Sequence, residues 1–383
     1  MANRIVCKFG GSSVRDAQAI ERCLQIIQDT EGAKMMVVSA TYDTTNQLEK
    51  LADFFLSNFE ASKIYLKSIL DRHKEIAVQL NINESMEMVF LGLEKEILKL
   101  GEQIASKSYL YDHNMDALYS FGERLSSHLV YFYAKELLKD RDVKFIDARK
   151  VIITNGDFKK ALPLVNDIKE AAYQEILSDD SFKSFYITQG FIGQSQKGET
   201  TTLGREGSDF SAVLFAEAIG ANRVYIWTDV PGIATCDPRL IEDAQFISEM
   251  SYEEASAMAM AGAKVLFPKT LEPAMRSSID VYVKSTYEPD CTGTRISGSV
   301  GEGRKIVGLA FDEKVIENRN YMKISFIGNS LLNENFNPYD LLKESGISLE
   351  TFEQTQKKVS LLVPKNQFER ALKICHDYLL EYC

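Results

Sequence analysis

Lys8 lies at the end of a short apolar segment, Ile5 to Cys7, and is followed at once by the glycine turn Gly10-Gly11. Residues without Cβ let backbone N–H groups approach an anion closely, and a helix beginning near Ser12 would add its positive dipole end. The lysine would supply a point charge for a phosphoryl group in transfer. The spacing also fits a plain strand-to-helix connection, and neither common nucleotide fingerprint is present.

A second polar segment runs from Thr200 to Asp209, after Gly190 and before an apolar helix expected over 210–219. Arg205 carries the planar fork that grips a carboxylate through two hydrogen bonds, which lysine lacks. Asp209 falls in the first turn of the expected helix, where an acid also commonly complements the helix dipole. The density of glycines, hydroxyls and charges favours a ligand site.

Two further regions carry candidate residues. The apolar run Arg223 to Thr228 ends in the turn Asp229 to Gly232, and Arg239 and Lys264 follow. Ligands of open α/β sheets bind where strands end, although Pro-Gly is also a simple turn. Glu123 is expected early in a helix, where it could equally be an exposed capping acid.

Composition excludes several classes of protein. A formal net charge of −11 over 383 residues argues against a nucleic-acid partner. No apolar run reaches the roughly 20 residues that span a bilayer, and no signal peptide is recognised, so we expect a cytoplasmic protein. The six cysteines and four histidines are scattered, and their spacing predicts neither a metal centre nor a histidine-based triad.

Strand-like runs alternate with helical stretches along the first three quarters of the chain. These runs are Ile5–Cys7, Met35–Ser39, Lys144–Asp147, Phe185–Thr188, Arg223–Thr228 and Val281–Val283. The alternation predicts an α/β fold with a mainly parallel sheet sandwiched by helices. Between Thr45 and Lys139 the apolar spacing is helical throughout, which predicts a long helical insertion.

A glycine-rich stretch at 297–303 marks a change of composition. We therefore predict a large domain over 1–296, a linker over 297–304 and a small α+β domain over 305–383. The elements expected in the small domain are a strand (Met322–Ile327), a helix (Pro338–Ser345), two strands (Ile347–Thr351 and Lys358–Val363) and a helix (Gln367–Tyr382).

Taken together, the motifs resemble those of aspartokinases in the amino-acid kinase superfamily. The resemblance covers residues 4 to about 296 and is carried by 8–14, 38–40, 45–46, 120–123, 188–191, 202–205, 207–209, 227–232 and 262–266. It implies the amino-acid kinase fold, ATP and Mg²⁺ as cofactors, and phosphorylation of the side-chain carboxylate of L-aspartate. That reaction opens synthesis of lysine, threonine, methionine and diaminopimelate.

The resemblance also implies a role for each matching residue. The transferred phosphate would be held by Lys8, Gly10 and Gly11, and the nucleotide by Thr228, Asp229, Ala234, Arg239, Lys264 and Val265. Aspartate would be held by Ser39, Thr45, Glu123 and Arg205, with Glu123 facing the ammonium and Arg205 a carboxylate. Asp209 would orient Lys8. Mg²⁺ would be held largely by the nucleotide phosphates, and no protein metal ligand is predicted.

Several positions depart from the pattern. Where this chain has Glu206, the family usually has Gly or Asn. Where it has Ala234 and Phe267, the family usually has an aromatic residue and a histidine. Residues 305–383 resemble one ACT module, whereas these enzymes usually carry two. Because the module resembles the second rather than the effector-binding first, we expect a homodimer through this domain and weak or absent inhibition by lysine and threonine.

Two alternatives stay open. One is another amino-acid kinase, acting on glutamate, acetylglutamate, carbamate or a nucleoside monophosphate. The other is a catalytically silent amino-acid sensor built on the kinase fold. It is motivated by Glu206, Ala234 and the missing ACT module, whereas the presence of Lys8, Arg205, Asp209 and Lys264 argues against it. The helical insertion and the segment 121–123 favour aspartate as the substrate.

Overall fold

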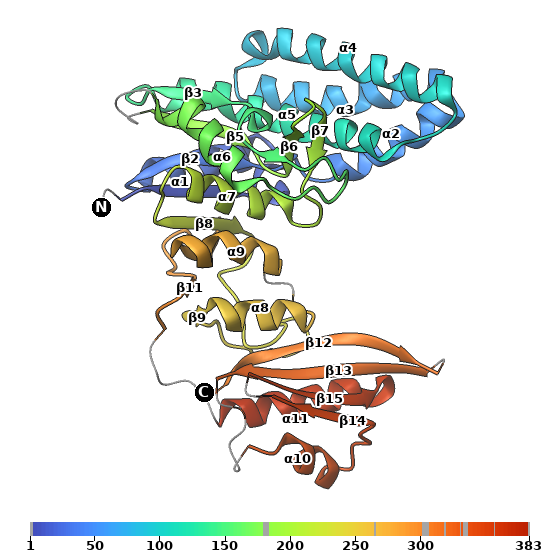
Figure 1. Ribbon diagram of the computed structural model, residues 1–383, viewed down its shortest axis with the longest axis vertical. Helices are drawn as coiled ribbons and strands as arrows, with labels where there is room; N and C mark the ends of the chain where they lie inside the picture. Colours follow the sequence, from blue (N-terminus) through green and yellow to red (C-terminus); the bar gives the residue numbers. More distant parts are fainter. Residues whose placement is uncertain are drawn as a thin grey trace. The chain divides into compact units, whose positions relative to one another are not determined.

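The computed structural model describes residues 3–178, 184–263, 266–300, 306–317, 319–329, 331, 336–355 and 357–381. The chain divides into two compact units (Figure 1). The first comprises Met1–Asp229 with Lys284–Pro289, and the second Val230–Val283 with Asp290–Cys383.

The first unit is built on parallel strands in the order β3-β5-β2-β1-β8. Their bounds are β3 Val143–Ile146, β5 Phe185–Gln189, β2 Ala33–Val38, β1 Ile5–Phe9 and β8 Arg223–Thr228. Each lies within two residues of the run expected from the sequence. The predicted α/β class with a mainly parallel sheet is confirmed.

Side chains of β1 alternate between two faces of this sheet, as in any strand. Ile5, Cys7 and Phe9 belong to one apolar core with residues of α1 (Ala17–Asp29) and α5 (Asp112–Leu137). Lys8 is out of phase with them and reaches α7 (Gly207–Ala218) through an ion pair. The period of the strand therefore removes Lys8 from the apolar core and directs it to the start of α7.

The predicted helical insertion is confirmed. It consists of α2 (Thr44–Ser57), α3 (Phe59–Gln79), α4 (Asn83–Lys107) and α5, drawn side by side in Figure 1. Apolar residues of all four helices share one core with strands β1, β2 and β5. Helix α5 packs against both α4 and the sheet, so it joins the insertion to the strands.

Several elements of this unit were not predicted. Strands β4 (Ile153–Thr154), β6 (Ile192–Ser195) and β7 (Thr200–Thr202) form a separate small sheet, and α6 spans Val165–Ala172. The helix expected near Ser12 is only a 3₁₀ turn, Gly11–Val14. The α-helix begins at Ala17, because Asp16 caps it by accepting a hydrogen bond of 2.8 Å from the Ala19 N–H.

The second unit contains two groups of strands. Strand β11 (Thr294–Ser297) pairs antiparallel with β10 (Asp280–Ser285) and parallel with β9 (Glu249–Ser251), and helices α8 (Tyr252–Met260) and α9 (Pro268–Ser277) accompany them. The C-terminal sheet is antiparallel, in the order β12-β13-β15-β14. Its elements are β12 Ile306–Ile316, β13 Arg319–Gly328, α10 Pro338–Glu344, β14 Thr351–Gln354, β15 Lys358–Pro364 and α11 Phe368–Leu380.

Two expectations for the C-terminal sheet were wrong. Strand β12 was missed, and the strand expected over Ile347–Thr351 lies further along, as β14. Gly308 interrupts the apolar pattern of β12, and glycine is uncommon inside strands. A Cβ at this position would lie 3.0 Å from the Thr235 carbonyl oxygen, so the glycine allows a close packing contact.

The segment around Thr235 packs against the C-terminal sheet of the same unit. The Leu309 N–H donates to the Thr235 carbonyl oxygen at 2.6 Å, and the Thr235 hydroxyl lies 3.2 Å from Nε2 of His376 on α11. Cys236 and Ile241 belong to the core of that sheet. The predicted linker, 297–304, lies partly outside the described residues, and the predicted division into domains stays a prediction.

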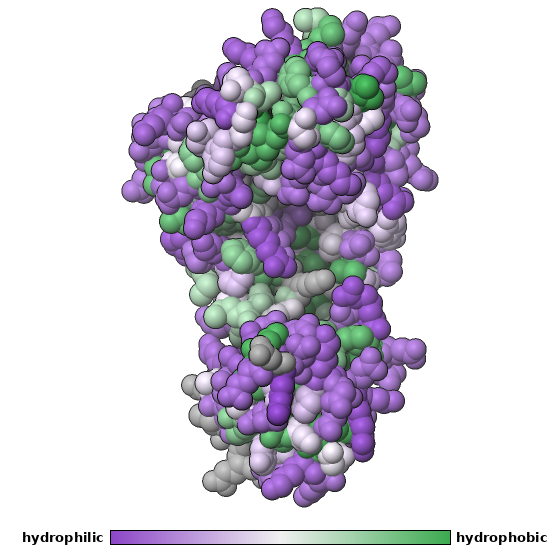
Figure 2. Space-filling model, turned by 90° about the vertical axis from the view of Figure 1, so that its right-hand side faces the viewer, coloured by the Kyte–Doolittle hydropathy of each residue, from purple (hydrophilic) through white to green (hydrophobic). Residues whose placement is uncertain are grey.

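Within the described parts of the chain, no helix is both long and apolar enough to span a membrane. The face drawn in Figure 2 is covered mainly by hydrophilic side chains, with apolar ones scattered among them.

Candidate active site

A cleft of about 590 Å³ lies within the first unit. It is lined by residues from β1, the loop after β2, helices α2 and α5, and the loop before α7. Of the residues predicted from the sequence, it gathers Lys8, Gly11, Ser39, Thr45, Glu123, Arg205 and Asp209. Lys8, Gly11 and Ser39 lie at or after the ends of parallel strands β1 and β2, Thr45 and Glu123 lie on helices α2 and α5, and Arg205 and Asp209 lie just before α7 and in its first turn.

Lys8 and Asp209 form an ion pair in this cleft. The Lys8 Nζ lies 2.6 Å from the Asp209 Oδ1, and the side chains are 12% and 11% exposed. Asp209 is in the first turn of α7, so its carboxylate also faces the positive end of that helix. The pair holds the ammonium of Lys8 at the wall of the cleft.

The glycine turn allows two loops to approach closely. A Cβ on Gly11 would lie 2.8 Å from the Ala40 carbonyl oxygen, and the Tyr42 N–H donates to the Gly11 carbonyl at 3.1 Å. Gly10 lies beside the ammonium, since its Cβ would be 3.4 Å from Lys8 Nζ. The turn after β1 is thus tied to the loop after β2, and both line the cleft.

Glu123 lies in the middle of α5 and is 3% exposed, so the expectation of an early helical position and the alternative of an exposed cap were both wrong. Its Oε1 accepts a long hydrogen bond of 3.4 Å from the Ala40 N–H. Its Oε2 is buried and has no hydrogen-bond partner among the described residues. Burial raises the pKa of this carboxyl to about 8.

Arg205 and Glu206 are exposed in the loop between β7 and α7. The Arg205 guanidinium makes no ion pair with any carboxylate of the described residues, and it lines the cleft. Glu206 has a φ of 54°, in the left-handed region that glycine and asparagine tolerate best. A glycine or an asparagine would adopt this conformation at a lower cost than a glutamate.

Other residues of the cleft were missed by sequence reasoning. Tyr119 donates to Glu49 Oε1 at 2.6 Å, and both line the cleft with Lys159. The backbone of Lys159 is held by Asp116, a fully buried carboxylate on α5. Asp116, Tyr119 and Glu123 follow helical spacing on one face of α5, which is the signal that could have found them.

A buried polar cluster supports the turn between β2 and α2. His73 donates from Nδ1 to the Ile69 carbonyl at 2.7 Å, so its Nε2 accepts from the Thr41 hydroxyl at 2.8 Å. Burial lowers the pKa of His73 to about 4, so it remains neutral. Arg72 donates to the Thr41 and Thr44 hydroxyls. The turn that carries Thr41 into the cleft is therefore fixed by α3.

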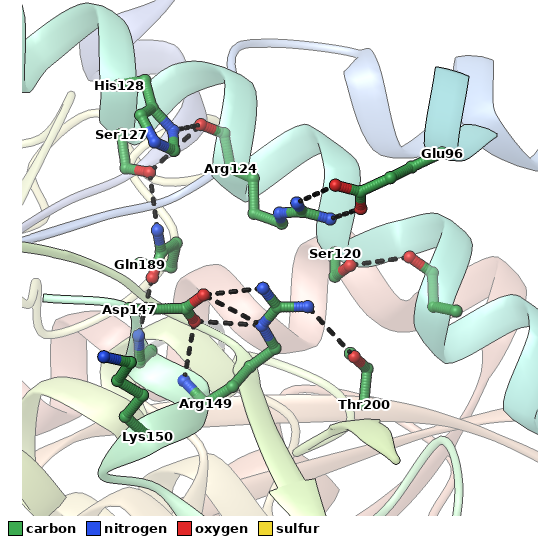
Figure 3. A network of polar contacts seen from close by, with 12 residues as sticks. Glu96, Ser120, Arg124, Ser127, His128, Asp147, Arg149, Lys150, Gln189 and Thr200 are labelled. Atoms are coloured by element: carbon green, nitrogen blue, oxygen red, sulfur yellow. Dashed lines mark hydrogen bonds and ion pairs between the residues drawn. The ribbon is translucent and has the colours of Figure 1, made fainter. Parts of the chain in front are cut away.

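Figure 3 shows a second polar network, beside α5 and the end of β5. The Gln189 amide donates to the Ser127 hydroxyl at 3.0 Å. Arg149 pairs with Asp147 at 2.6 Å and donates to the Thr200 hydroxyl at 3.3 Å. These bonds tie α5 to β5 and fix the start of β7, which leads into the Arg205 loop.

Of the residues predicted to hold the nucleotide, the structure describes Thr228, Asp229, Ala234 and Arg239, and none of these four lines the cleft. Thr228 and Asp229 end β8, where the Thr228 hydroxyl donates to Asp229 Oδ1 at 3.1 Å. Ala234 forms a bridge with Phe246, and Arg239 pairs with Asp237 at 2.6 Å; both belong to the second unit. Lys264 and Val265 lie outside the described residues. The predicted nucleotide roles stay predictions.

The chain belongs to the amino acid kinase family, whose model matches residues 3–285. Among curated proteins it is similar to lysine-sensitive aspartokinase 3 of Escherichia coli, with 39% identity over 303 residues, 77% of this chain and 64% of that protein. The aspartokinase of Chlamydia trachomatis is 36% identical over 298 residues, 78% of this chain and 65% of that protein. The matches thus span less than two thirds of these relatives.

Among solved structures, that of E. coli aspartokinase III in complex with aspartate and ADP is similar, with a TM-score of 0.86 and 28% identity. The alignment covers 99% of this chain and 100% of that one. The complex of the same enzyme with lysine and aspartate gives a TM-score of 0.85 at 29% identity, over 98% and 99% of the two chains. The resemblance to aspartokinases predicted from the motifs is confirmed.

The buried Glu123 predicts a pH-dependent effect on stability. With its pKa near 8 instead of 4.5, the folded protein keeps a proton that the unfolded chain loses, so stability falls as the pH rises from about 4.5 to 8. Each pH unit in that window costs up to about 1.4 kcal/mol. Glu123→Gln should therefore raise Tm relative to wild type, and more at pH 8 than at pH 5.

Thermal melts at several pH values check this expectation. Glu102→Gln is the matched control, because it removes a carboxyl from an exposed position of α4, the helix that packs against α5. A gain from Glu123→Gln that did not grow between pH 5 and pH 8 would show that the Glu123 carboxyl is ionised when folded.

Proposed function

We propose that this protein is an aspartate kinase, which transfers the γ-phosphoryl group of ATP to the side-chain carboxylate of L-aspartate and forms 4-phospho-L-aspartate. The observation that carries the proposal is the buried Glu123 carboxylate, whose unpartnered oxygen shares a cleft with Lys8 and Arg205. The reaction would open the synthesis of lysine, threonine, methionine and diaminopimelate. Similarity to E. coli aspartokinase III, solved with aspartate and ADP, supports it.

Aspartate would be recognised by groups of opposite charge. Its ammonium would pair with Glu123, and a positive charge beside this carboxyl favours ionisation, so binding would release the proton that Glu123 holds. Arg205 would hold the α-carboxylate through two parallel hydrogen bonds. Ser39 and Thr45 would donate or accept hydrogen bonds from the same wall of the cleft.

Phosphoryl transfer would then depend on position and charge. An oxygen of the aspartate side chain bonds to the γ-phosphorus while the bond from phosphorus to the β,γ-bridging oxygen breaks, and its electron pair leaves with ADP. The attacking carboxylate is already ionised, so no base is required. Lys8, oriented by Asp209, would neutralise charge on the transferred group beside the backbone of Gly10 and Gly11.

ATP would be held by Thr228, Asp229, Ala234, Arg239, Lys264 and Val265, as the resemblance implies. Mg²⁺ would enter with the nucleotide, bound largely by its phosphates, and would screen their negative charge.

An ADP-release assay tests the proposal directly. Purified protein would be supplied with MgATP and, in parallel, aspartate, glutamate, acetylglutamate or carbamate. Release of ADP that depends on aspartate supports an aspartate kinase. Release with another acceptor would indicate a different amino-acid kinase, and binding of aspartate without any release would indicate a sensor.

Removing the charge of Lys8 should abolish turnover. Lys8→Met should lower kcat on the order of 10²-fold or more, because the transferred group loses its nearest cation. It should also lower Tm, since Asp209 becomes a buried, unpaired charge. Lys8→Met/Asp209→Asn should recover Tm and remain inactive.

Steady-state kinetics and melting of the two variants separate catalysis from folding. Lys144→Ala, in strand β3 and outside the cleft, is the control for loss of a lysine. Near-normal kcat in either cleft variant would refute the assignment of Lys8 to the phosphoryl group.

Arg205→Lys should raise the KM for aspartate about tenfold or more while the KM for ATP changes little, because lysine keeps the charge but loses the fork. Kinetics with each substrate varied in turn measure this difference. Arg141→Lys, which does not line the cleft, is the matched control. An equal rise in the KM of aspartate and of ATP would instead assign Arg205 to the nucleotide.

We also infer a homodimer that pairs through residues 305–383. Strand β12 is at an edge of the C-terminal sheet and spans 11 residues. Its Leu309 N–H is bonded to Thr235, and the part of the strand beyond that contact would accept a second strand. Sedimentation velocity should give a dimer at the concentrations used for assay. A monomer under those conditions would contradict the inference.

A further inference from the structure

Asp116 is a buried carboxylate in the first unit that the proposed reaction does not use. It lies on α5, is 0% exposed, and belongs to none of the motifs that carry the resemblance. A buried charge of this kind is retained only where hydrogen bonds replace the water it has lost. Those bonds lead to two segments that line the cleft.

Both carboxylate oxygens of Asp116 are engaged. Oδ2 accepts from the Lys159 N–H at 2.8 Å and from the Thr202 N–H at 2.8 Å. Oδ1 accepts from the Thr202 hydroxyl at 2.8 Å and, more distantly, from the Lys159 N–H at 3.1 Å. Asp116 thus fastens two loops, which are far apart in sequence, to one point on α5.

These two loops carry cations of the cleft. Lys159 lines the cleft itself and has a φ of 66°, a left-handed conformation that a lysine adopts only when its surroundings impose it. Thr202 ends β7, and Arg205 follows three residues later in the chain. The position of Arg205 is therefore set through Thr202, whose backbone and hydroxyl are both bound by Asp116.

Asp116 and Glu123 are two helical turns apart on the same face of α5, at about 3.6 residues per turn. One rigid helix then carries the group proposed for the substrate ammonium and the anchor of the loop that bears Arg205. We propose that Asp116 is a positioning residue that fixes the spacing between the ammonium and carboxylate subsites, and so selects the length of the amino-acid substrate. This inference rests on the proposed function of the same cleft.

The geometry is specific to a carboxylate. Asparagine has nearly the same shape, but its amide nitrogen can only donate a hydrogen bond. In an Asp116→Asn variant this nitrogen would replace one of the two accepting oxygens, so two donors would face each other. Burial raises the pKa of Asp116, and the hydrogen bonds from Lys159 and Thr202 oppose that rise. Loss of the carboxylate should therefore release both loops while leaving α5 itself intact.

Asp116→Asn tests the proposal, with Asp112→Asn as the matched control. Asp112 lies one turn earlier on α5, is exposed, and pairs with Lys159 only through the side chain, at 3.4 Å. Asp116→Asn should raise the aspartate KM about tenfold or more, leave the ATP KM unchanged, and reduce the preference for aspartate over glutamate. Asp112→Asn should resemble wild type in all three measurements.

Amide hydrogen exchange gives a readout that does not depend on the reaction. The Lys159 and Thr202 amides should exchange faster in Asp116→Asn and at the wild-type rate in Asp112→Asn. If wild type did not phosphorylate aspartate, the proposed function would fail, whereas the exchange rates would still decide whether Asp116 anchors the loops. Unchanged exchange in a folded Asp116→Asn variant would overturn the inference.

A second pair of variants covers the case in which Asp116→Asn does not fold. Thr202→Val removes one hydroxyl donor to Asp116, and Thr202→Ser keeps it. The aspartate KM should rise in Thr202→Val and return to the wild-type value in Thr202→Ser. An aspartate KM unaffected by Thr202→Val, or equal rises in the KM of aspartate and ATP, would contradict a role in substrate spacing.

Discussion

The ion pair between Lys8 and Asp209 is the interaction on which the cleft depends. Both side chains are about nine-tenths buried, and neither could be accommodated there alone without a large desolvation cost. The pair requires Lys8 to be out of phase with the apolar residues of β1, and it requires α7 to begin at the end of that strand. A phosphate binding at this edge would meet an ammonium already held in position, which lowers the cost of ordering it.

The second unit has a comparable constraint at Thr235. Its carbonyl accepts from Leu309 and its hydroxyl contacts His376, so the segment that follows β8 is bonded to a strand and to a helix of the C-terminal sheet. Gly262 is packed in the same way, since a Cβ there would clash with the Phe311 carbonyl oxygen. The C-terminal sheet is thus hydrogen-bonded to the Thr235 segment and packed against Gly262.

The sequence was sufficient to predict the parallel strands, the helical insertion and seven of the residues that line the cleft. Lys8 comes just before a glycine turn at the end of β1, and Arg205 and Asp209 lie in the loop before α7 and in its first turn. Few folding requirements compete with function in such connections. Strand β12 was missed because Gly308 and the charged run 312–314 interrupt its apolar pattern. The start of α1 was also predicted wrongly. The helix begins at Ala17 because Asp16, and not the glycine turn, provides its N-terminal cap.

Asp116 was not predicted because three of its four hydrogen bonds come from backbone N–H groups, and the identity of the donating residues does not indicate such bonds. Glu123 was predicted, but its burial in the middle of α5 was not, because only the packing of helices and strands far apart in sequence decides whether a helical carboxyl is buried. The two carboxylates show what distinguishes a structural group from one that binds a ligand. Asp116 has both oxygens engaged by its own chain, whereas Glu123 keeps one oxygen without a partner among the described residues. A folded chain retains such an unsatisfied group only at a cost, and an arriving ammonium would remove that cost.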